Sequence, residues 1–266
     1  MSEITRRPAK GGRLLRSYYV LLLALLYLPI GILFVFSLST NTSIGFPIKG
    51  FTLDWYQEAF TDETLLNSAK NSFVVAVASS TVATVLGTAI AVLLLRYDFR
   101  GKTVLAALAV LPLIVPAVVL GVSLLILFRA LNLPLSVLSI GVAHVVVGLP
   151  FTTLIVFARL TGFDRALEDA AMDLGATYAT ALRLIVLPVI APAVVAAWLV
   201  AFTVSFDEVA LALFLAGRDP TFPVHLAGQI RFTGNLPVLV AAAVLLMAAS
   251  IGLLLVAERI RRLRPS

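Results

Sequence analysis

The sequence is poor in the side chains that usually carry catalysis, because it has no cysteine and only two histidines among its 266 residues. The absence of cysteine excludes disulfides, thiolate-ligated metals and cysteine nucleophiles. Charged residues are also scarce, at 13% of the chain, whereas soluble domains contain about 25%. Hydrophobic residues make up 61%, and the mean hydropathy is +1.05. A single water-soluble core could not bury so much apolar surface, so the composition predicts an integral membrane protein.

Motifs typical of enzymes are missing as well. The sequence contains neither H-E-x-x-H nor G-x-S-x-G, and no cluster of metal-ligating residues. Gly101-Lys102-Thr103 resembles the end of a phosphate-binding loop, but Arg96 stands where that motif requires its first glycine. We therefore predict no catalytic residue, no metal site and no ATP bound by this route, which argues against an intramembrane enzyme.

Six apolar segments are long enough to cross a membrane, since about 20 helical residues span the hydrocarbon core. They are residues 17–38, 72–95, 103–128, 135–157, 188–205 and 236–257. The first is too long for the apolar region of a cleaved signal peptide, so we expect it to be retained. The fifth is the shortest, and its helix could begin inside the preceding loop. The sequence thus predicts an all-α transmembrane domain over residues 17–257, between basic segments at 1–16 and 258–266.

Lysine and arginine are distributed unevenly between the connections. Fifteen of them lie on one side of the six-span layout and five on the other. The larger group comprises Arg6, Arg7, Lys10, Arg13, Arg16, Arg96, Arg100, Lys102, Arg159, Arg165, Arg183, Arg259, Arg261, Arg262 and Arg264. The smaller group comprises Lys49, Lys70, Arg129, Arg218 and Arg231. Because these residues accumulate in cytoplasmic segments, both termini are predicted to be cytoplasmic, and topology rather than nucleic-acid binding explains the net charge of +6.

Prolines interrupt several of the predicted spans, at Pro29, Pro112, Pro116, Pro150 and Pro192. A proline inside a helix frees a backbone carbonyl, which in lipid must be satisfied by neighbouring helices or water. The prolines fit either a bundle around a pathway or the ordinary tolerance of membrane helices for proline.

The connection between the fourth and fifth spans, residues 158–188, differs from the other loops. Helical spacing places four apolar side chains on one face and acids on the other; the four are Leu167, Ala170, Ala171 and Leu174. Gly175 can adopt the left-handed conformation that ends a helix, and Thr177 suits the cap of a second short helix over 178–184. This loop is predicted to form two short helices leading to Pro188, at the start of the fifth span.

Two interpretations of the first loop helix differ in what it contacts. An amphipathic helix lying on lipid favours Lys and Arg on its polar face, whereas this helix carries Glu168, Asp169 and Asp173. The small side chains of Ala170 and Ala171 would let another surface approach closely, and the acids could pair with basic residues opposite. The acidic face favours docking of a protein over binding of lipid.

The same residues resemble a known motif. Asp169-Ala170-Ala171, three residues, Gly175, nine residues and then Ile185-Val186-Leu187-Pro188 match the E-A-A-x3-G-x9-I-x-L-P loop of permease subunits from binding-protein-dependent ABC importers. The resemblance covers essentially all 266 residues, because six spans with this loop before the fifth are also the plan of that family. It implies a six-helix type I importer permease with a cytoplasmic coupling-helix loop. Asp169 replaces the motif's Glu, which leaves open whether Glu168 compensates.

The resemblance also implies partners and a location. A permease of this family works with a second permease subunit, here expected to be a related but different chain, and with two ATPase subunits. An extracytoplasmic solute-binding protein delivers the substrate, and ATP and Mg²⁺ are bound by the ATPases, so no cofactor is expected in this chain. The implied location is the bacterial inner membrane, among lipid. A self-contained secondary transporter is disfavoured because no acid lies deep in any predicted span.

A second group of segments resembles the spermidine/putrescine-type permeases of this family. The segments are Ser205-Phe206-Asp207-Glu208, Thr221-Phe222-Pro223-Val224, Asn71-Ser72 and His144 with Pro150-Phe151. This likeness implies a small solute, foremost a polyamine. Opines, phosphonates and amino-acid derivatives remain alternatives, since selectivity in such importers resides largely in the binding protein.

Five residues are candidates for the substrate pathway: Ser205, Phe206, Asp207, Glu208 and His144. The two carboxylates fall near the outer end of the fifth span, where they would attract a polycation. They could equally belong to a solvated loop or pair with nearby arginines, Arg218 or Arg231. His144 is the only titratable group deep in a predicted span, which fits either a pathway role or an interhelical hydrogen bond to Ser or Thr.

Overall fold

The computed structural model describes residues 11–43, 45–230 and 236–262. Helices carry the regular structure of these residues, apart from an isolated antiparallel bridge between Ser39 and Phe51. The expected all-α class is therefore confirmed. The chain divides into two compact units, which are Met1–Thr61 with Gln229–Ala248, and Asp62–Gly228 with Ala249–Ser266.

The first unit contains α1 (Gly11–Ser37) and α2 (Asp54–Thr61), and α12 (Leu236–Arg262) begins in it. Large apolar side chains along α1 are exposed, from Leu15 to Val35, as expected for a helix that is solvated by lipid. The end of α1 and the loop that follows it are fixed to α2 by two hydrogen bonds. Trp55 Nε1 donates to the Ser39 carbonyl at 2.7 Å, and the Tyr56 and Ser37 hydroxyls lie 2.6 Å apart.

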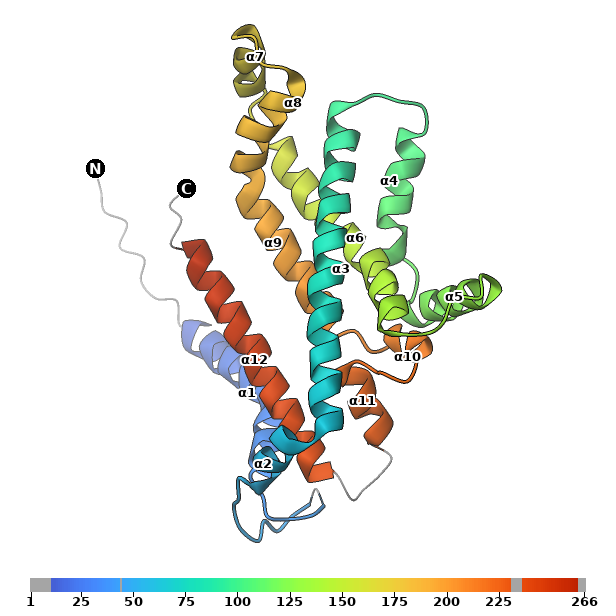
Figure 1. Ribbon diagram of the computed structural model, residues 1–266. Coiled ribbons are helices and arrows are strands. Elements are labelled where there is room, and N and C mark those ends of the chain that lie inside the picture. The colour runs from blue at the N-terminus through green and yellow to red at the C-terminus, as the bar shows by residue number, and fades with distance from the viewer. Residues whose placement is uncertain (1–10, 44, 231–235, 263–266) are drawn as a thin grey trace, which may run out of the picture. The chain divides into compact units, whose positions relative to one another are not determined.

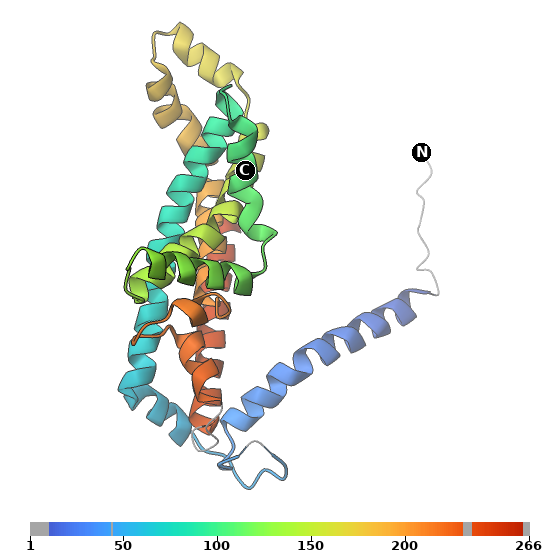
Figure 2. The same cartoon turned by 90° about the vertical axis from the view of Figure 1, so that its right-hand side faces the viewer.

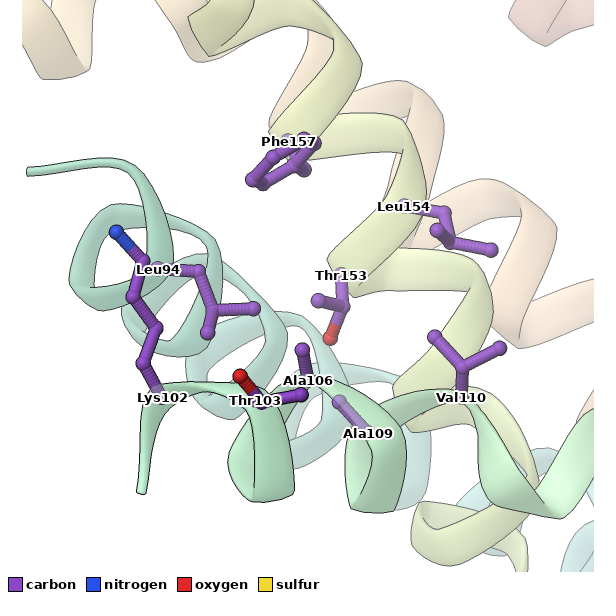
Figure 3. A pocket seen from close by; sticks show the side chains of 9 residues that line it. All are labelled: Leu94, Lys102, Thr103, Ala106, Ala109, Val110, Thr153, Leu154 and Phe157. Carbon is purple, nitrogen blue, oxygen red and sulfur yellow. The ribbon is translucent and has the colours of Figure 1, made fainter. Parts of the chain in front are cut away.

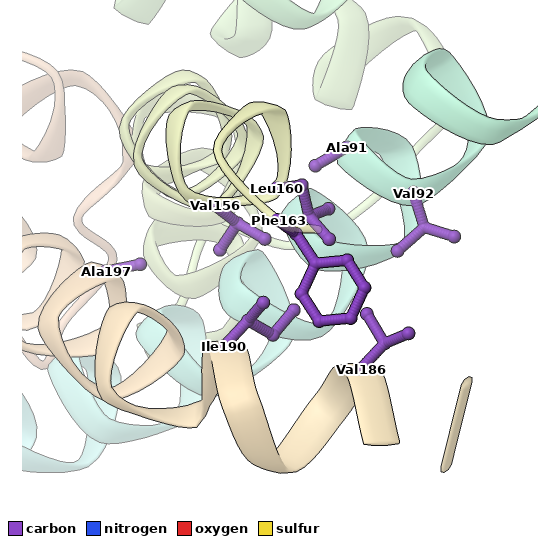
Figure 4. Packing of buried hydrophobic residues seen from close by; sticks show 8 residues of the cluster. All are labelled: Ala91, Val92, Val156, Leu160, Phe163, Val186, Ile190 and Ala197. Carbon is purple, nitrogen blue, oxygen red and sulfur yellow. The ribbon is translucent and has the colours of Figure 1, made fainter. Parts of the chain in front are cut away.

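Three long helices form the centre of the second unit: α3 (Glu63–Arg96), α6 (Val137–Thr161) and α9 (Leu187–Phe206) pack against one another (Figures 1 and 2). Asp62 caps α3, because its carboxylate accepts from the backbone N–H groups of Thr64 and Leu65. One apolar cluster joins the three helices near the end of α3. Figure 4 shows its members, which are Ala91, Val92, Val156, Leu160, Phe163, Val186, Ile190 and Ala197.

The remaining helices of this unit are shorter. They are α4 (Lys102–Val110), the 3-10 turn η1 (Leu111–Leu113), α5 (Ala117–Ala130), α7 (Ala166–Asp173), α8 (Tyr178–Ala181), the π-helical turn η2 (Leu182–Val186), α10 (Ala212–Leu215) and α11 (Phe222–Gln229). A second apolar cluster packs α10 against α3, α5 and α6; its buried members are Val75, Phe128, Ile140, Ala143, Leu211, Ala212 and Leu215.

The predicted span over residues 103–128 is broken in the structure. The helical segments Lys102–Leu113 and Ala117–Ala130 are bent by 111° relative to each other, and in Figure 1 α5 points sideways from α4. Pro112 lies in the 3-10 turn and Pro116 directly precedes α5. Neither proline has an N–H to continue the α-helical ladder, so the break falls between them.

Four helices are long and apolar enough to cross a membrane, and a fifth span results if the bent pair is counted as one. The four are Leu15–Ser37, Glu63–Arg96, Val137–Thr161 and Tyr178–Phe206. The last includes α8, η2 and α9 without interruption, so the fifth expected span does begin inside the preceding loop. Within α12, Leu236–Gly252 is a shorter apolar helix. A multi-pass membrane protein is thus supported, while the count of six spans stays a prediction.

Helices α3 and α6 approach closely through small residues. A Cβ added to Gly87 would lie 2.8 Å from the Cβ of Thr152, and one added to Gly148 would lie 3.1 Å from that of Ala83. The Thr152 hydroxyl donates to the Ala83 carbonyl across the same contact at 2.8 Å. Small residues at this spacing let membrane helices pack backbone to backbone.

Replacing Gly87 with alanine should therefore loosen the α3–α6 contact, at a cost of about 1–3 kcal/mol from overpacking. The matched control is Gly141→Ala in α6, where an added Cβ meets no heavy atom within 4 Å. That change should be neutral or stabilise the helix by about 0.5–1 kcal/mol. Thermal unfolding of the purified protein in detergent measures both, and equal shifts for the two variants would contradict the close approach.

Candidate functional site

The loop of residues 158–188 folds as its sequence predicts. Helix α7 ends before Gly175, which has a left-handed φ of +89°. The Thr177 hydroxyl caps α8 by accepting from the Thr180 N–H at 3.3 Å. Figure 1 shows α7 and α8 at the tip of the second unit, at the end where α3 and α4 are connected. The first short helix is confirmed, whereas the second begins at Tyr178 as predicted but continues into the long helical segment Tyr178–Phe206.

One face of α7 is open to solvent, and we call it the loop face. It includes Asp169 and Ala170 of the E-A-A-like motif, together with large apolar side chains. Leu174 is 91% exposed, and Leu167 and Met172 are also exposed. Apolar side chains beside a carboxylate on an exposed helix are suited to contact another protein.

Glu168 faces into the fold, and this bears on whether it could face a partner and stand in for Asp169. It is 5% exposed and forms an ion pair with Arg96, the last residue of α3. The Arg96 guanidinium also lies over the Phe163 ring, 5.5 Å from its centre. The sequence left this question open because helical spacing assigns faces of an isolated helix and cannot show which face the rest of the fold covers.

The second half of the motif lies at the joint between the loop and the fifth span. Ile185 is half-buried against the apolar cluster of Figure 4, next to buried Val186. Leu187 and Pro188 are exposed at the first turn of α9, where a proline needs no hydrogen-bond partner. These residues fix how the loop enters α9, whereas Asp169 and Ala170 remain available to another molecule.

His144 forms the interhelical hydrogen bond that was one of its two expected roles. Its Nδ1 lies 2.7 Å from the Ser205 hydroxyl, which lies 2.9 Å from the hydroxyl of Ser79. All three side chains are buried, and they come from α6, α9 and α3 respectively. A polar chain therefore joins the three central helices where water is excluded.

Removing the middle of this chain should cost stability. In Ser205→Ala both His144 Nδ1 and the Ser79 hydroxyl lose a buried partner, which we expect to cost about 1–3 kcal/mol. Ser123→Ala on α5 is the control, because that serine is exposed and bonds only to a carbonyl of its own helix. Unfolding midpoints in detergent provide the readout, and a Ser205→Ala protein as stable as the control would refute the network.

Asp207 and Glu208 follow α9 and have different roles. Glu208 is half-buried, and its carboxylate accepts from the Leu211 N–H at 2.9 Å, so it stabilises the following turn. Asp207 stays solvent-accessible, while partial desolvation by its surroundings raises the pKa of its carboxyl above the usual range. Among the described residues neither carboxylate forms an ion pair, Arg218 included, and Arg231 lies outside them.

Aromatic side chains form a row along α9 that ends at Phe206. The rings of Trp198 and Phe202 stack at 5.4 Å, and those of Phe202 and Phe206 stack at 5.5 Å. Phe73 of α3 meets Phe202 edge to face at 6.1 Å. Spacing of i, i+4 and i+8 could have revealed this row, but the sequence interpretation singled out Phe206 alone. The row places π-faces directly before Asp207.

Two segments that resemble the spermidine/putrescine-type permeases contact each other. The Asn71 side-chain amide donates to the Pro220 carbonyl at 3.3 Å, and the Phe222 N–H donates to the Ser72 hydroxyl at 2.8 Å. These contacts fix the start of α11 to α3. In the described part of the chain they hold the segment between α10 and α11 against α3.

A separate pocket of about 400 Å³ lies between α3, α4 and α6 (Figure 3). Its walls are mostly apolar, and none of the expected pathway residues lines it. The lining residues are Leu94, Lys102, Thr103, Ala106, Ala109, Val110, Thr153, Leu154 and Phe157. An apolar lining with a lysine is unsuited to a polycation, so we do not assign this pocket to the substrate.

Comparison with known proteins gives the family. Residues 83–263 match the model described as binding-protein-dependent transport system inner membrane component. The chain belongs to this family. It is 37% identical over 253 residues to the spermidine/putrescine transport system permease protein PotC of Escherichia coli (strain K12), covering 94% of this chain and 95% of PotC. It is 35% identical over 232 residues to the putrescine transport system permease protein PotI of the same strain, covering 84% of this chain and 82% of PotI.

More distant matches agree with this assignment. A probable molybdenum ABC transporter permease protein of Haloferax volcanii is 32% identical over 203 residues, covering 73% of this chain and 75% of that protein. A bacterial alginate ABC importer has the same fold, with a TM-score of 0.77 at 14% identity over 96% of this chain and 95% of that chain. The methionine ABC transporter MetNI has a TM-score of 0.64 at 19% identity, and the match covers 74% of this chain and 94% of that chain.

Family membership makes this permease a multi-pass component of a binding-protein-dependent importer. Its relatives are transport subunits, in agreement with the expectation that it is not an enzyme. The spermidine/putrescine-type subfamily is confirmed by the near full-length matches to PotC and PotI. The ABC importer fold expected from the resemblance is confirmed as well.

Proposed function

We propose that this permease forms half of the translocation pathway of an ABC importer for a polyamine such as spermidine or putrescine. The observation that carries the proposal is 37% identity to PotC over 94% of this chain, supported by 35% identity to PotI. The molybdenum permease is less similar, at 32% over 73% of the chain, so an oxyanion substrate is less favoured. Opines, phosphonates and amino-acid derivatives are the alternatives.

The residues after α9 are chemically suited to a polyamine. A polyamine carries ammonium groups separated by methylene runs, which aromatic faces and carboxylates bind well. Phe206 ends the aromatic row and Asp207 follows it, while Ser205 directly precedes Phe206 and bonds to His144 of α6. Glu208 contributes by stabilising the turn from Glu208 to Leu211, which follows Asp207. This arrangement supports a path for a cation along α9.

The complex proposed here has four further subunits or proteins. A second, related permease completes the pathway, two ATPases bind the loop faces, and an extracytoplasmic protein delivers the solute. ATP and Mg²⁺ belong to the ATPases, and both termini of this chain lie in the cytoplasm. The exposed Asp169, Ala170 and Leu174 support the docking role.

Uptake of radiolabelled solutes tests the substrate. Cells lacking this gene should take up spermidine or putrescine at least about tenfold more slowly than cells in which the gene is restored, because the proposed importer cannot form its pathway without this subunit. Molybdate and phosphonate uptake are the controls and should be unchanged. Normal polyamine uptake in the deletion strain, together with loss of one of the control solutes, would overturn the polyamine assignment.

A further inference from the structure

The last residues of α3, at the end predicted to be cytoplasmic, bind the start of α7 in the 158–188 loop. The Arg165 guanidinium donates to the Leu95 carbonyl at 3.0 Å. The next residue, Arg96, forms the ion pair with Glu168. Two consecutive residues of α3 thus hold two points on α7, one at its beginning and one in its first turn.

A third contact ties the other loop helix to the same end. The ring of Tyr97, which directly follows α3, meets the ring of Tyr178 edge to face at 5.8 Å. Tyr178 is the first residue of α8, which continues through η2 into α9. Both loop helices are therefore attached to the end of α3 by side chains, and α8 is also joined to α9 by the backbone.

The ion pair is buried, which makes it a tight connection. The side chains of Arg96 and Glu168 are only 4% and 7% exposed. Phe163, over which Arg96 lies, belongs to the apolar cluster and lies beside Val92 and Val186 in Figure 4. Separating two charges in such surroundings would leave each without a partner or water, so the two side chains are expected to move together.

Helix α3 can carry a displacement from this end to the other. It runs without a break from Glu63 to Arg96, and Ser72 lies about 36 Å from Arg96 at 1.5 Å per residue. At its midpoint α3 bonds to Ser205 of α9 through Ser79, and nearer its far end it bonds to the Phe222 N–H through Ser72. A shift of α3 would therefore reach the segment that contains the expected pathway residues.

We propose that Arg96 and Glu168 are positioning residues that transmit the displacement of α7 to α3 during transport, separately from docking of the ATPase. The inference rests on the proposed function in one respect, namely that an ATPase moves the loop. Glu168 points into the fold, whereas Asp169 and Ala170 lie on the loop face. The loop then acts on the bundle by two routes, through the backbone into α9 and through this ion pair into α3.

The test uses the complete complex in proteoliposomes, with ATPase co-purification, ATP hydrolysis and spermidine uptake measured on the same preparations. In Arg96→Gln and Glu168→Gln we expect the ATPase to remain bound and to hydrolyse ATP. Spermidine uptake per ATP hydrolysed should fall about tenfold, within the range of typical coupling between sites. Because the pair acts as one unit, the double variant should be no worse than either single variant.

The matched control is the other ion pair at this end of the unit. Asp98 and Lys102 lie 2.8 Å apart, but the Asp98 side chain is 99% exposed. Asp98→Asn and Lys102→Gln should leave uptake per ATP unchanged. The proposal is overturned if Arg96→Gln and Glu168→Gln keep wild-type uptake per ATP, or if both release the ATPase, because the pair would then serve docking.

A second measurement separates transmission from a loss of folding. The chain has no cysteine, so Tyr97→Cys and Tyr178→Cys introduce its only thiols. Bridging them with a short thiol-specific cross-linker in the Glu168→Gln background should restore part of the lost coupling; no restoration would count against a mechanical role. A wild-type complex that stimulates its ATPase but takes up no spermidine would refute only the polyamine assignment.

Discussion

Replacing Ala170 with tryptophan is expected to release the ATPase from the complex almost completely. Ala170 is exposed on the loop face, where a methyl side chain lets a partner approach and an indole would hold it away. A loss of about 2 kcal/mol, typical of a central interface residue, corresponds to roughly thirtyfold weaker association. Co-purification of the ATPase with the membrane-inserted permease measures the effect.

Charge reversal at Asp169 should act in the same direction. Asp169→Arg removes the carboxylate that stands at the first position of the E-A-A-like motif, and Glu168 cannot replace it because Glu168 is paired with Arg96. The control is Ala130→Trp, at an exposed alanine that ends α5. That variant should bind the ATPase normally. Wild-type association in both loop variants would contradict the docking role.

Neutralising Asp207 should slow spermidine uptake by about tenfold, because a carboxylate at the mouth of a pathway concentrates cations there. The pKa of this carboxyl is raised by partial desolvation, so it loses its charge at a higher pH than an ordinary aspartate, whose value is 3.8. External acidification should therefore reduce uptake of spermidine by the wild type at a pH above that at which ordinary aspartates become protonated. Initial rates in right-side-out vesicles across this pH range provide the measurement.

The Asp207→Asn variant should take up spermidine slowly at all these pH values, since its side chain carries no charge at any of them. Asp219→Asn is the matched control, because Asp219 is an exposed acid in the same outer loop. It should retain both the wild-type rate and its pH dependence. If Asp207→Asn matched Asp219→Asn, the carboxylate would have no role in admitting the substrate.

Composition and local signals were sufficient to predict much of the fold. Apolar runs located the long helices, and Gly175 and Thr177 marked the ends of the loop helices, because a left-handed turn and a cap are properties of a few adjacent residues. The sequence places Pro112 and Pro116 inside a predicted span but does not predict the 111° bend near them. Proline shows where a helix can break, but the angle depends on what the two pieces pack against.

The site could be predicted less completely than the fold. The burial of Glu168 depends on Arg96, 72 residues earlier in the chain, and helical spacing within the loop carries no information about that contact. A bond from His144 to a serine or threonine is one of the two roles that its chemistry predicts, but the partner Ser205 is brought near only by the packing of α6 on α9. Contacts between segments that are distant in the chain are the feature of the site that a single sequence does not predict.

Photo-cross-linking from single positions tests the central claim most directly, namely that the loop face binds the ATPase. A photoreactive phenylalanine analogue is placed at Leu174 of the loop face, which is 91% exposed, or at Leu138, which is 77% exposed at the start of α6. We expect the ATPase to be cross-linked from position 174 and not from position 138. Cross-linking from 138 but not 174, or from neither position in a complex that transports, would contradict the account.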